Sequence, residues 1–407
     1  MINGRLTSAE AADRLGVKPA TLYAYVSRGL LTREKTARGS TFDPRDVARL
    51  AQSGRQGTAL TPGSEPTSDP LFVTSVSLIE AGHLYYRGLD AVALSGRHSF
   101  EETAEWLWSA TWPETPRPDW SEAASVAGAV DAVLASTVGG ARPLERFMLA
   151  TAAAGVADEL RHDLSPAAVQ LVGRGLVSAL ARAAGAESAE GPIARRLWCA
   201  LSPLPATSER VALLDAALVL SADHELAPST MAARVAASFR ADPYAVVLTG
   251  LGPASGSWHA GSSGAPTEVE RLLVEAESVG AARAVGDRLR RGGVIPHGFG
   301  MPLYPGGDPR GAELLARLDS LGAAQDKQRV VEDVLSVASS RGFPPANVDL
   351  GLGALSFCAG MPVESAQAVA TLGKIVGWLA HAMEEYAEPS LFRARGYYVG
   401  VRPEPAD

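Results

Sequence analysis

The chain has 407 residues, a formal net charge of −8, an apolar fraction of 46% and two cysteines. At about 100–200 residues per domain this length predicts two to four domains, and the apolar fraction excludes global disorder. No apolar run reaches the roughly 18 residues of a membrane-spanning helix, and the first residues lack a secretory signal. Two cysteines make neither a disulfide framework nor a zinc site. We therefore expect a cytoplasmic protein that contacts no membrane and binds no metal.

Charge is divided unevenly between a short basic segment and a long acidic remainder. Residues 1–57 contain ten Lys and Arg residues against five Asp and Glu residues, a balance of +5. The remaining 350 residues have a net charge of −13. Such an asymmetry indicates that residues 1–57 face nucleic acid, although the chain as a whole is acidic.

Residues 1–57 contain signals for three short helices. Residues 7–10 (Thr-Ser-Ala-Glu) form a capping box that begins a helix, and Gly16 suits its C-terminal end. Pro19 suits the first turn of a second helix, which ends at Gly29, and residues 43–46 (Asp-Pro-Arg-Asp) begin a third. Two short helices across a tight glycine turn predict a helix-turn-helix.

Composition changes twice after this module. Residues 53–70 are rich in Gly, Ser, Thr, Pro, Gln, Asp and Glu, which predicts a linker, and we take residues 58–70 as its flexible part. Residues 71–401 are rich in Ala, Leu, Arg and Glu, and their apolar residues recur at helical spacing, as in 100–107 and 366–380. We therefore expect an all-α protein in which a helix-turn-helix of residues 1–57 is joined by the linker to a multi-helical body.

The sequence from residue 6 to residue 31 resembles the winged helix-turn-helix of MerR-type regulators, above all in its Leu-Gly-Val and Thr-Leu-Tyr-x-Tyr elements. The resemblance implies a second helix that enters the major groove of double-stranded DNA, and a basic wing at residues 32–42. Five side chains can donate hydrogen bonds to phosphates or base edges: Lys18, Thr21, Tyr23, Arg28 and Arg38. A small helical domain whose basic face contacts proteins is the alternative.

Polar residues in apolar or glycine-rich surroundings recur along the body, and such residues are costly to bury without partners. They occur in this order: Tyr86-Arg87-Gly88, Phe100-Glu101-Glu102, Asp223-His224-Glu225 with Ser229-Thr230, Gly256-Ser257-Trp258-His259, Gly298-Phe299-Gly300 with Asp308-Pro309-Arg310, Asn347-Val348-Asp349, and Arg393 to Gly400. In register, these motifs resemble those of the citrate synthase family over residues 71–401.

The resemblance to citrate synthase implies an architecture and an activity. It implies an all-α body with a large domain (about 71–258 and 355–401) and a small domain (about 259–354), and a homodimer. It also implies a transferase of the tricarboxylic acid cycle, an acyltransferase that uses acetyl-CoA and oxaloacetate. The CoA thioester is then a substrate, and no covalently bound cofactor is expected.

Two residues carry the reaction in this resemblance. Asp349 matches the carboxylate that removes a methyl proton from acetyl-CoA, a role that suits a partly buried carboxylate with a raised pKa. His259 matches the imidazole that donates a hydrogen bond to the thioester oxygen as the enol forms. The alternatives are an Asp that caps the helix after Asn347 and a satisfied histidine in a turn.

Three further residues match positions that bind the oxo acid. His224 matches a histidine that binds oxaloacetate, and the alternative is a salt bridge with its neighbours Asp223 and Glu225. Arg310 matches an arginine that binds an oxaloacetate carboxylate, and Arg393 matches one supplied across the dimer interface. A guanidinium group suits both roles because it can bind a carboxylate with two hydrogen bonds. A surface ion pair is the alternative for either arginine.

Two positions depart from the family pattern. Met301 stands where the family has a second histidine after Gly-Phe-Gly, which polarises the oxaloacetate carbonyl. His297, four residues earlier, is a candidate replacement donor. Lys374 stands where the family has a substrate-binding arginine. A lysine keeps the positive charge but cannot bind a carboxylate with the two parallel hydrogen bonds of a guanidinium group. Both changes fall on the oxo-acid side.

Three functions remain compatible with these patterns. The first is an enzyme that condenses acetyl-CoA or another acyl-CoA with oxaloacetate or a related 2-oxo acid, with weak use of oxaloacetate. The second is a DNA-binding transcriptional regulator whose citrate synthase-like body senses an acyl-CoA or an oxo acid. The third is an inactive relative whose N-terminal module mediates oligomerisation.

Overall fold

The computed structural model describes residues 6–15, 17–28, 30–36, 39–42, 47, 73–113, 118–137, 140–185, 191–256, 265–292, 295–322 and 324–389. The chain divides into two compact units, of which one spans residues 72–392 and the other contains the N-terminal elements. The predicted third helix from residue 43 and the predicted linker 58–70 lie outside the described residues, apart from residue 47.

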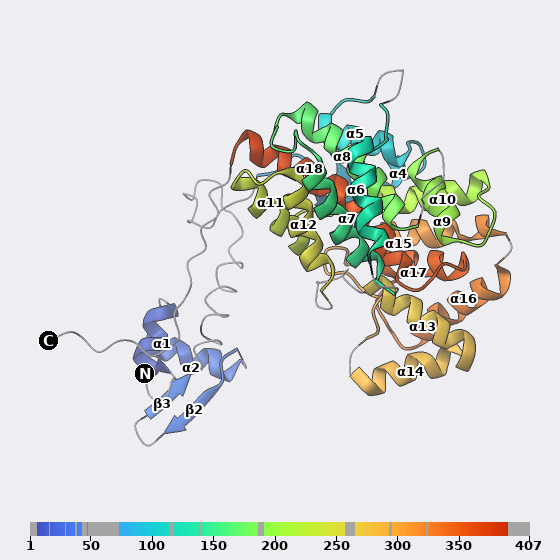
Figure 1. The fold of residues 1–407 in the computed structure, drawn as a ribbon. Helices are drawn as coiled ribbons and strands as arrows, with labels where there is room; N and C mark the ends of the chain where they lie inside the picture. The colour runs from blue at the N-terminus through green and yellow to red at the C-terminus, as the bar shows by residue number, and fades with distance from the viewer. Residues whose placement is uncertain are drawn as a thin grey trace. The chain divides into compact units, whose positions relative to one another are not determined.

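The N-terminal unit combines two short helices with a small antiparallel sheet of order β1-β3-β2. Its elements are β1 (Leu6–Thr7), α1 (Ser8–Leu15), α2 (Pro19–Ser27), β2 (Arg33–Thr36) and β3 (Gly39–Phe42) (Figure 1). The predicted capping box is confirmed: Thr7 N donates to Glu10 Oε2 over 2.8 Å, and Glu10 N donates to Thr7 Oγ1 over 3.3 Å. Strands β2 and β3 form a hairpin, with Thr36 opposite Gly39, where the sequence predicts a wing.

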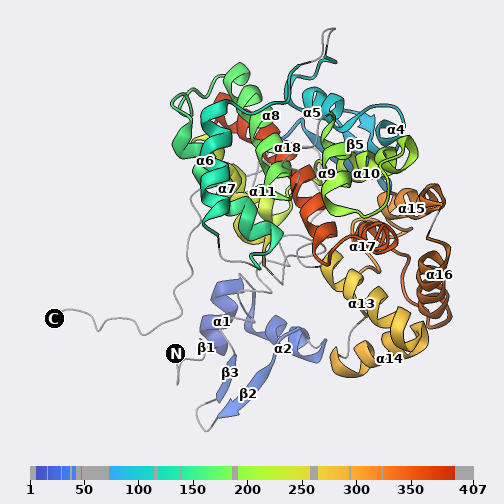
Figure 2. The same cartoon turned by 45° about the vertical axis from the view of Figure 1, so that its right-hand side comes forward.

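The large unit is built mainly of helices. They are α4 (Ala91–Ser95), α5 (Phe100–Ser109), α6 (Ala124–Ala135), α7 (Pro143–Ala157), α8 (Pro166–Ala183), α9 (Ile193–Leu201), α10 (Ser208–Leu220), α11 (Pro228–Ser238), α12 (Pro243–Ala254), α13 (Ala265–Val279), α14 (Ala281–Gly292), α15 (Pro309–Ala316), the 3₁₀ helix η1 (Leu318–Leu321), α16 (Gln325–Ser340), α17 (Val348–Cys358) and α18 (Ser365–Ala387). In both views α13, α14, α16 and α17 lie together at one side of the unit (Figures 1 and 2).

Helix α18 is the central element of the large unit. It packs against α5, α8, α10, α11, α12, α13 and α17, and most of its side chains are buried. A helix that is apolar on nearly every face is stable only when neighbours surround it. The position of α18 therefore follows from its sequence, and any polar group on it, such as Lys374, faces the interior or a cavity.

A three-stranded antiparallel sheet, which the sequence analysis did not predict, lies beside α10. It comprises β4 (Ser77–Glu80), β5 (His83–Tyr86) and β6 (Leu89–Asp90), in that order. Tyr86 fixes the sheet to the end of α10, because its hydroxyl donates to Val219 O (3.0 Å) and lies 3.2 Å from Asp223 O. The sheet thus holds the segment that follows α10.

Helices α15 and α17 approach each other closely at one glycine. A Cβ atom on residue 311 would lie 2.3 Å from Asn347 O, far inside any normal contact. Only glycine allows this approach. The contact brings the start of α15, which contains Arg310, next to the start of α17, which contains Asp349.

The predicted all-α class with a citrate synthase-like body is confirmed, with the two small sheets as additions. No helix among the described residues has both the length and the apolarity that a bilayer crossing requires. Among the same residues, no group of His, Cys, Asp or Glu side chains is arranged to hold a metal ion.

Candidate active site

Most of the described candidate residues of the body line one cavity of about 620 Å³. Five segments contribute: the turn between α10 and α11, the loop 300–303, the start of α15, the start of α17, and the face of α18 that bears residues 370 and 374. The predicted residues on the wall are His224, Arg310, Asp349 and Lys374, and Met301 lies there too. Segments far apart in sequence therefore meet at one place.

Asp349 is a buried carboxylate without a hydrogen-bonding partner. It lies in the first turn of α17, where its side chain is 1% exposed and both carboxylate oxygens lack a hydrogen bond. Burial raises the pKa of Asp349 to about 7, although the positive charges of Lys374 and Arg310 oppose the shift. The cap of α17 is Asn347, whose side chain accepts from Asp349 N over 3.0 Å. Asp349 is therefore not the capping residue.

The Gly-Phe-Gly loop is attached to the Asn-Val-Asp segment by two backbone hydrogen bonds and one from the Asn347 side chain. Asn347 N donates to Gly298 O (2.9 Å), Gly300 N donates to Pro345 O (2.8 Å), and Asn347 Nδ2 donates to Gly300 O (2.9 Å). Gly298 has a φ of +97°, and a Cβ there would lie 2.8 Å from Val269 Cγ2. This fit fixes Met301 at the cavity wall, beside the start of α17.

Arg310 is buried rather than part of a surface ion pair, with 3% of its surface exposed. Its Nε and Nη2 donate to the two oxygens of Asp308 over 3.0 and 2.8 Å. Asp308 also caps α15 and accepts from Val348 N (3.0 Å). The Arg310 guanidinium lies 5.4 Å from the centre of the Tyr304 ring. Because Asp308 occupies one edge of the guanidinium, Nη1 is the group left for an anion in the cavity.

His224 is bound to Tyr304 and not to its acidic neighbours. Its Nε2 lies 2.9 Å from the Tyr304 hydroxyl. Burial, with Arg310 and Lys374 nearby, lowers the pKa of His224 well below its usual value, so the imidazole is neutral. Burial raises the pKa of Tyr304 to about 12, so it stays a phenol. The salt-bridge alternative is wrong, because Asp223 contacts His381 and Glu225 accepts from Ile79 N (2.6 Å).

Lys374 is the cation of the cavity on α18. Burial lowers the pKa of Lys374 to about 8, while the Asp349 carboxylate opposes the shift and Arg310 adds to it. Lys374 and Asp349 therefore affect each other's charge state within one cavity. A proton acceptor and a cation are both present, which is the minimum for carbanion chemistry next to an anionic substrate.

A buried ion cluster, defined as Asp223, Arg234, His381, Glu384 and Glu385, supports the turn that carries His224. His381 Nε2 lies 3.3 Å from Asp223 Oδ2, and Arg234 Nη1 lies 3.0 Å from His381 Nδ1. Arg234 also donates to Glu385 Oε1 (2.7 Å) and Glu384 Oε2 (3.0 Å). The Ser77 hydroxyl donates a short hydrogen bond to Asp223. Each charge in this cluster thus has a partner.

The remaining predicted residues are not brought to the cavity by the described part of the chain. His297 is exposed and is not among the residues of the cavity wall. His259, Arg393 and Arg38 lie outside the described residues. In the N-terminal unit, Lys18, Tyr23 and Arg28 are exposed and Thr21 is partly buried. Arg33 of the hairpin lies over the Tyr23 ring, 5.6 Å from its centre.

Two polar residues of the site had no role assigned from the sequence: Tyr304, which contacts His224 and Arg310 of the cavity wall, and Ser221, which lies on the wall itself. Tyr304 stands in the Gly-Phe-Gly segment, and a tyrosine among glycines and prolines was a signal that its hydroxyl needs a buried partner. Ser221, the C-cap of α10, had no such signal. Its position is evident only from the fold.

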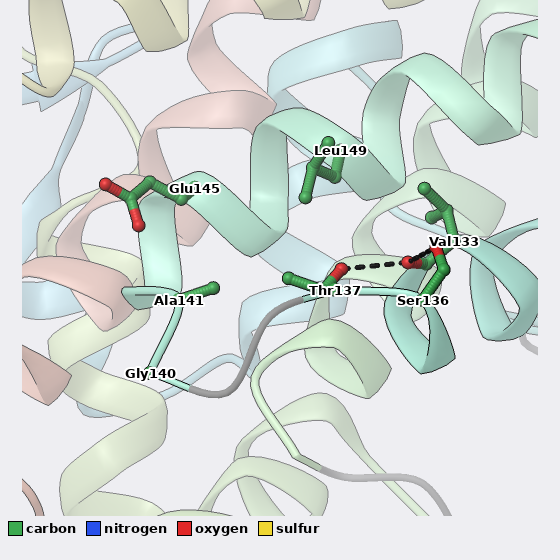
Figure 3. Close-up of a pocket in the computed structure, with 7 residues that line it drawn as sticks. All are labelled: Val133, Ser136, Thr137, Gly140, Ala141, Glu145 and Leu149. Atoms are coloured by element: carbon green, nitrogen blue, oxygen red, sulfur yellow. Dashed lines mark hydrogen bonds between the residues drawn. The ribbon is translucent and has the colours of Figure 1, made fainter.

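A second hollow, of about 530 Å³, lies between α6 and α7, and its described lining residues do not bring several charged groups together (Figure 3). Among its described lining residues only Glu145 is charged, and that carboxylate is bound to Arg142. The Thr137 hydroxyl donates to Val133 O over 2.8 Å within its own helix end. The side chains of Thr137 and Glu145 therefore already have partners, and we assign no catalytic role to this hollow.

Two family models match the chain, one over the N-terminal segment and one over the body. The family model described as "Citrate synthase, C-terminal domain" matches residues 68–395, and that described as "MerR HTH family regulatory protein" matches residues 6–53. The citrate synthase of Haloferax volcanii is 32% identical over 194 residues, which cover 46% of this chain and 50% of that relative. In this alignment the chain spans about half the length of its relative.

Two longer alignments and two solved structures extend the comparison. The citrate synthase of Mycolicibacterium smegmatis is 26% identical over 80% of this chain and 92% of its own length, and the 2-methylcitrate synthase of Mycobacterium tuberculosis is 26% identical over 80% and 88%. The Thermotoga maritima citrate synthase has a TM-score of 0.66 at 24% identity, covering 82% of this chain and 96% of its own. The Thermoplasma acidophilum enzyme, in a ternary complex with carboxymethyl coenzyme A and oxaloacetate, has a TM-score of 0.66 at 19% identity, covering 83% and 95%.

Proposed function

The chain belongs to the citrate synthase family, and we propose that it is an acyltransferase that condenses acetyl-CoA or another acyl-CoA with oxaloacetate or a related 2-oxo acid. The observation that carries this proposal is the buried, unpartnered carboxylate of Asp349 in the wall of a cavity that also holds Lys374 and Arg310. Leaving a carboxylate without hydrogen bonds is costly, and proteins tolerate that cost at sites where the group must accept a proton.

In the proposed reaction Asp349 acts as the base. Its carboxylate takes a proton from the carbon next to the thioester carbonyl, and that carbon forms a bond to the keto carbon of the oxo acid. The electron pair of the keto group moves to its oxygen, which takes up a proton. Water then hydrolyses the thioester and releases CoA. A pKa of about 7 suits Asp349 to this role near neutral pH.

The proposed binding groups surround this base. Lys374 and the Nη1 edge of Arg310 attract the carboxylates of the oxo acid, and the neutral His224, oriented by Tyr304, binds one of its oxygens. We assign His259 to the thioester oxygen and Arg393, from a second copy in a homodimer, to a carboxylate. We also propose a large domain of about 71–258 and 355–401 and a small domain of about 259–354.

The test is a thiol-release assay with the full-length protein. Acetyl-CoA and propionyl-CoA are each combined with a panel of 2-oxo acids, and reactions without an oxo acid measure background hydrolysis. We expect CoA release that depends on an oxo acid, with oxaloacetate a weak acceptor because Met301 cannot donate a hydrogen bond. Absence of acceptor-dependent release throughout the panel would overturn the proposal.

A second candidate function, a DNA-binding regulator, is favoured by the N-terminal unit. Residues 6–53 match a regulator family, and the exposed side chains of Lys18, Tyr23 and Arg28 lie on or beside α2. The body would then sense an acyl-CoA or an oxo acid, provided that the ligand binds the DNA-bound and free states differently. A gel shift on the DNA upstream of the coding sequence, with and without these ligands, tests it. We expect a sequence-specific shift that weakens with salt and in Arg28→Ala; failure to shift at low salt would contradict it.

A further inference from the structure

The wall of the cavity contains a hydroxyl group that the family resemblance leaves without a role. Ser221 caps the C-terminus of α10 and lines the cavity. It is 5% exposed, and its Oγ has no hydrogen-bonding partner. A serine at the end of a helix usually donates to a nearby backbone carbonyl. Because Ser221 also lines the cavity, its unpartnered hydroxyl points to a ligand there.

Ser221 packs against Gly373, the residue that precedes Lys374 on α18. A Cβ atom on Gly373 would lie 2.8 Å from Ser221 Cβ and 2.8 Å from Leu218 O, so the end of α10 packs directly against α18. Lys374 is the next residue on α18, and it lines the same cavity. The hydroxyl and the ammonium group thus belong to one wall, with Ala370 one turn away on α18.

The loop 300–303 cannot supply the same chemistry. Its cavity-lining residues, Gly300, Met301, Pro302 and Leu303, contain no side-chain hydrogen-bond donor. When the new carbon–carbon bond forms, the keto oxygen of the acceptor gains an electron pair and becomes an alkoxide. Donors that are already in place stabilise that oxygen because they need no reorganisation. Among the described wall residues, Ser221 at the end of α10 and Lys374 on the neighbouring α18 can both act as such donors.

We propose that Ser221 is a substrate-binding residue, whose hydroxyl donates a hydrogen bond to the keto oxygen of the 2-oxo acid beside the Lys374 ammonium group. The proposal rests on the acyltransferase function proposed above. It places the acceptor carbonyl against the α10–α18 wall and away from Met301. A 2-hydroxy acid can also accept this hydrogen bond, but only the keto group of a 2-oxo acid can take up the electron pair when the carbon–carbon bond forms.

The test compares Ser221→Ala with Thr103→Val in the full-length protein. Thr103 is a matched control, since its Oγ1 is likewise buried and unpartnered but lies on α5, outside the cavity wall. In the thiol-release assay we expect Ser221→Ala to lower kcat/KM for the oxo acid by about 10- to 100-fold. The KM for the acyl-CoA, and the exchange of its methyl protons with deuterated water, should stay unchanged. Thr103→Val should match the wild type.

A binding measurement separates this inference from the proposed function. Oxaloacetate, pyruvate and 2-oxoglutarate, with their 2-hydroxy analogues, are titrated calorimetrically into the wild type and both variants. If the wild type binds a 2-oxo acid but releases no CoA, the proposed function fails, and a weaker affinity in Ser221→Ala alone still supports the contact. Equal kcat/KM and equal affinity in Ser221→Ala and the wild type would overturn the inference, as would a wild type that binds no 2-oxo acid.

Discussion

The cavity and the buried ion cluster meet at the neighbouring residues His224 and Asp223, yet they treat buried carboxylates in opposite ways. In the cluster, burial acts against the charge of Glu384, but hydrogen bonds from His381 and Ser75 outweigh it and lower the pKa to about 2. In the cavity, burial raises the pKa of Asp349 to about 7, and no hydrogen bond compensates. Every charged group of the cluster has a partner within the protein, whereas the cavity contains polar groups that have none.

This difference distinguishes a structural use of buried charge from a chemical one. A cluster whose members are all paired stabilises one arrangement, and it gains nothing from a ligand. Unpartnered groups such as Asp349 and Ser221 carry a cost in stability, and in the proposed function a bound substrate supplies the missing partner. Burial alone therefore does not distinguish a structural polar group from a functional one. The presence or absence of hydrogen-bonding partners does so better.

The largest effect expected from this comparison concerns Asp349→Asn. The change removes the proposed base, so acceptor-dependent CoA release should fall by about 10²–10⁴-fold. Since the carboxylate is unpartnered, its neutral replacement should also raise the Tm at pH 8 by about 2–4 °C in scanning calorimetry. Asp223→Asn in the ion cluster is the matched control and should lower the Tm. A lower Tm in Asp349→Asn would mean that the carboxylate stabilises the fold.

A second effect, on stability alone, is expected for Arg234→Met. This change leaves Glu384 and Glu385 without their guanidinium partner, so the free energy of unfolding in urea should fall by about 3–5 kcal/mol. The double variant Arg234→Met with Glu385→Gln should recover part of the loss, because one uncompensated charge is removed. If the two changes were simply additive in their destabilisation, the cluster would not act as a unit.

The smallest expected effect is on the pH profile of CoA release. Asp349 must be ionised to act as a base, so activity should rise with pH through about 7. Lys374 must be protonated to bind an anion, so activity should decline as pH rises beyond about 8. Initial rates across this range should give a narrow maximum, and Lys374→Met should abolish the decline on the alkaline side. A wild-type profile that is flat from about pH 6 to 9 would contradict both assignments.

Signals between neighbouring residues were sufficient to predict the starts of α1 and α2. The capping box at Thr7 and Glu10 and the proline start of α2 depend on residues within one turn, and the structure confirms both. The sheet β4–β6 was missed because its strands have two to four residues. Its turn at Ala81-Gly82, where both residues have positive φ, was the signal available in the sequence.

The internal contacts of the site could not be predicted in the same way. The residues on its wall were located through motifs, but their partners are set by the tertiary fold. The bond between His224 and Tyr304 joins residues 80 positions apart, and the packing of Ser221 on Gly373 joins α10 to α18. His297 lies near Met301 in sequence yet is exposed, because the positive-φ glycines turn the chain between them. Closeness to Met301 in sequence therefore does not place His297 on the cavity wall.

The glycine at the contact of α15 with α17 has a consequence at the level of the gene. Every single-base change of a glycine codon that encodes another amino acid introduces a Cβ atom. At residue 311 that atom would meet the carbonyl oxygen of Asn347 at 2.3 Å. The helices would have to separate, and the starts of α15 and α17, which hold Arg310 and Asp349, would separate with them. No single-base substitution at this codon gives an amino acid that fits the contact. We therefore expect residue 311 to remain glycine while the surrounding sequence changes.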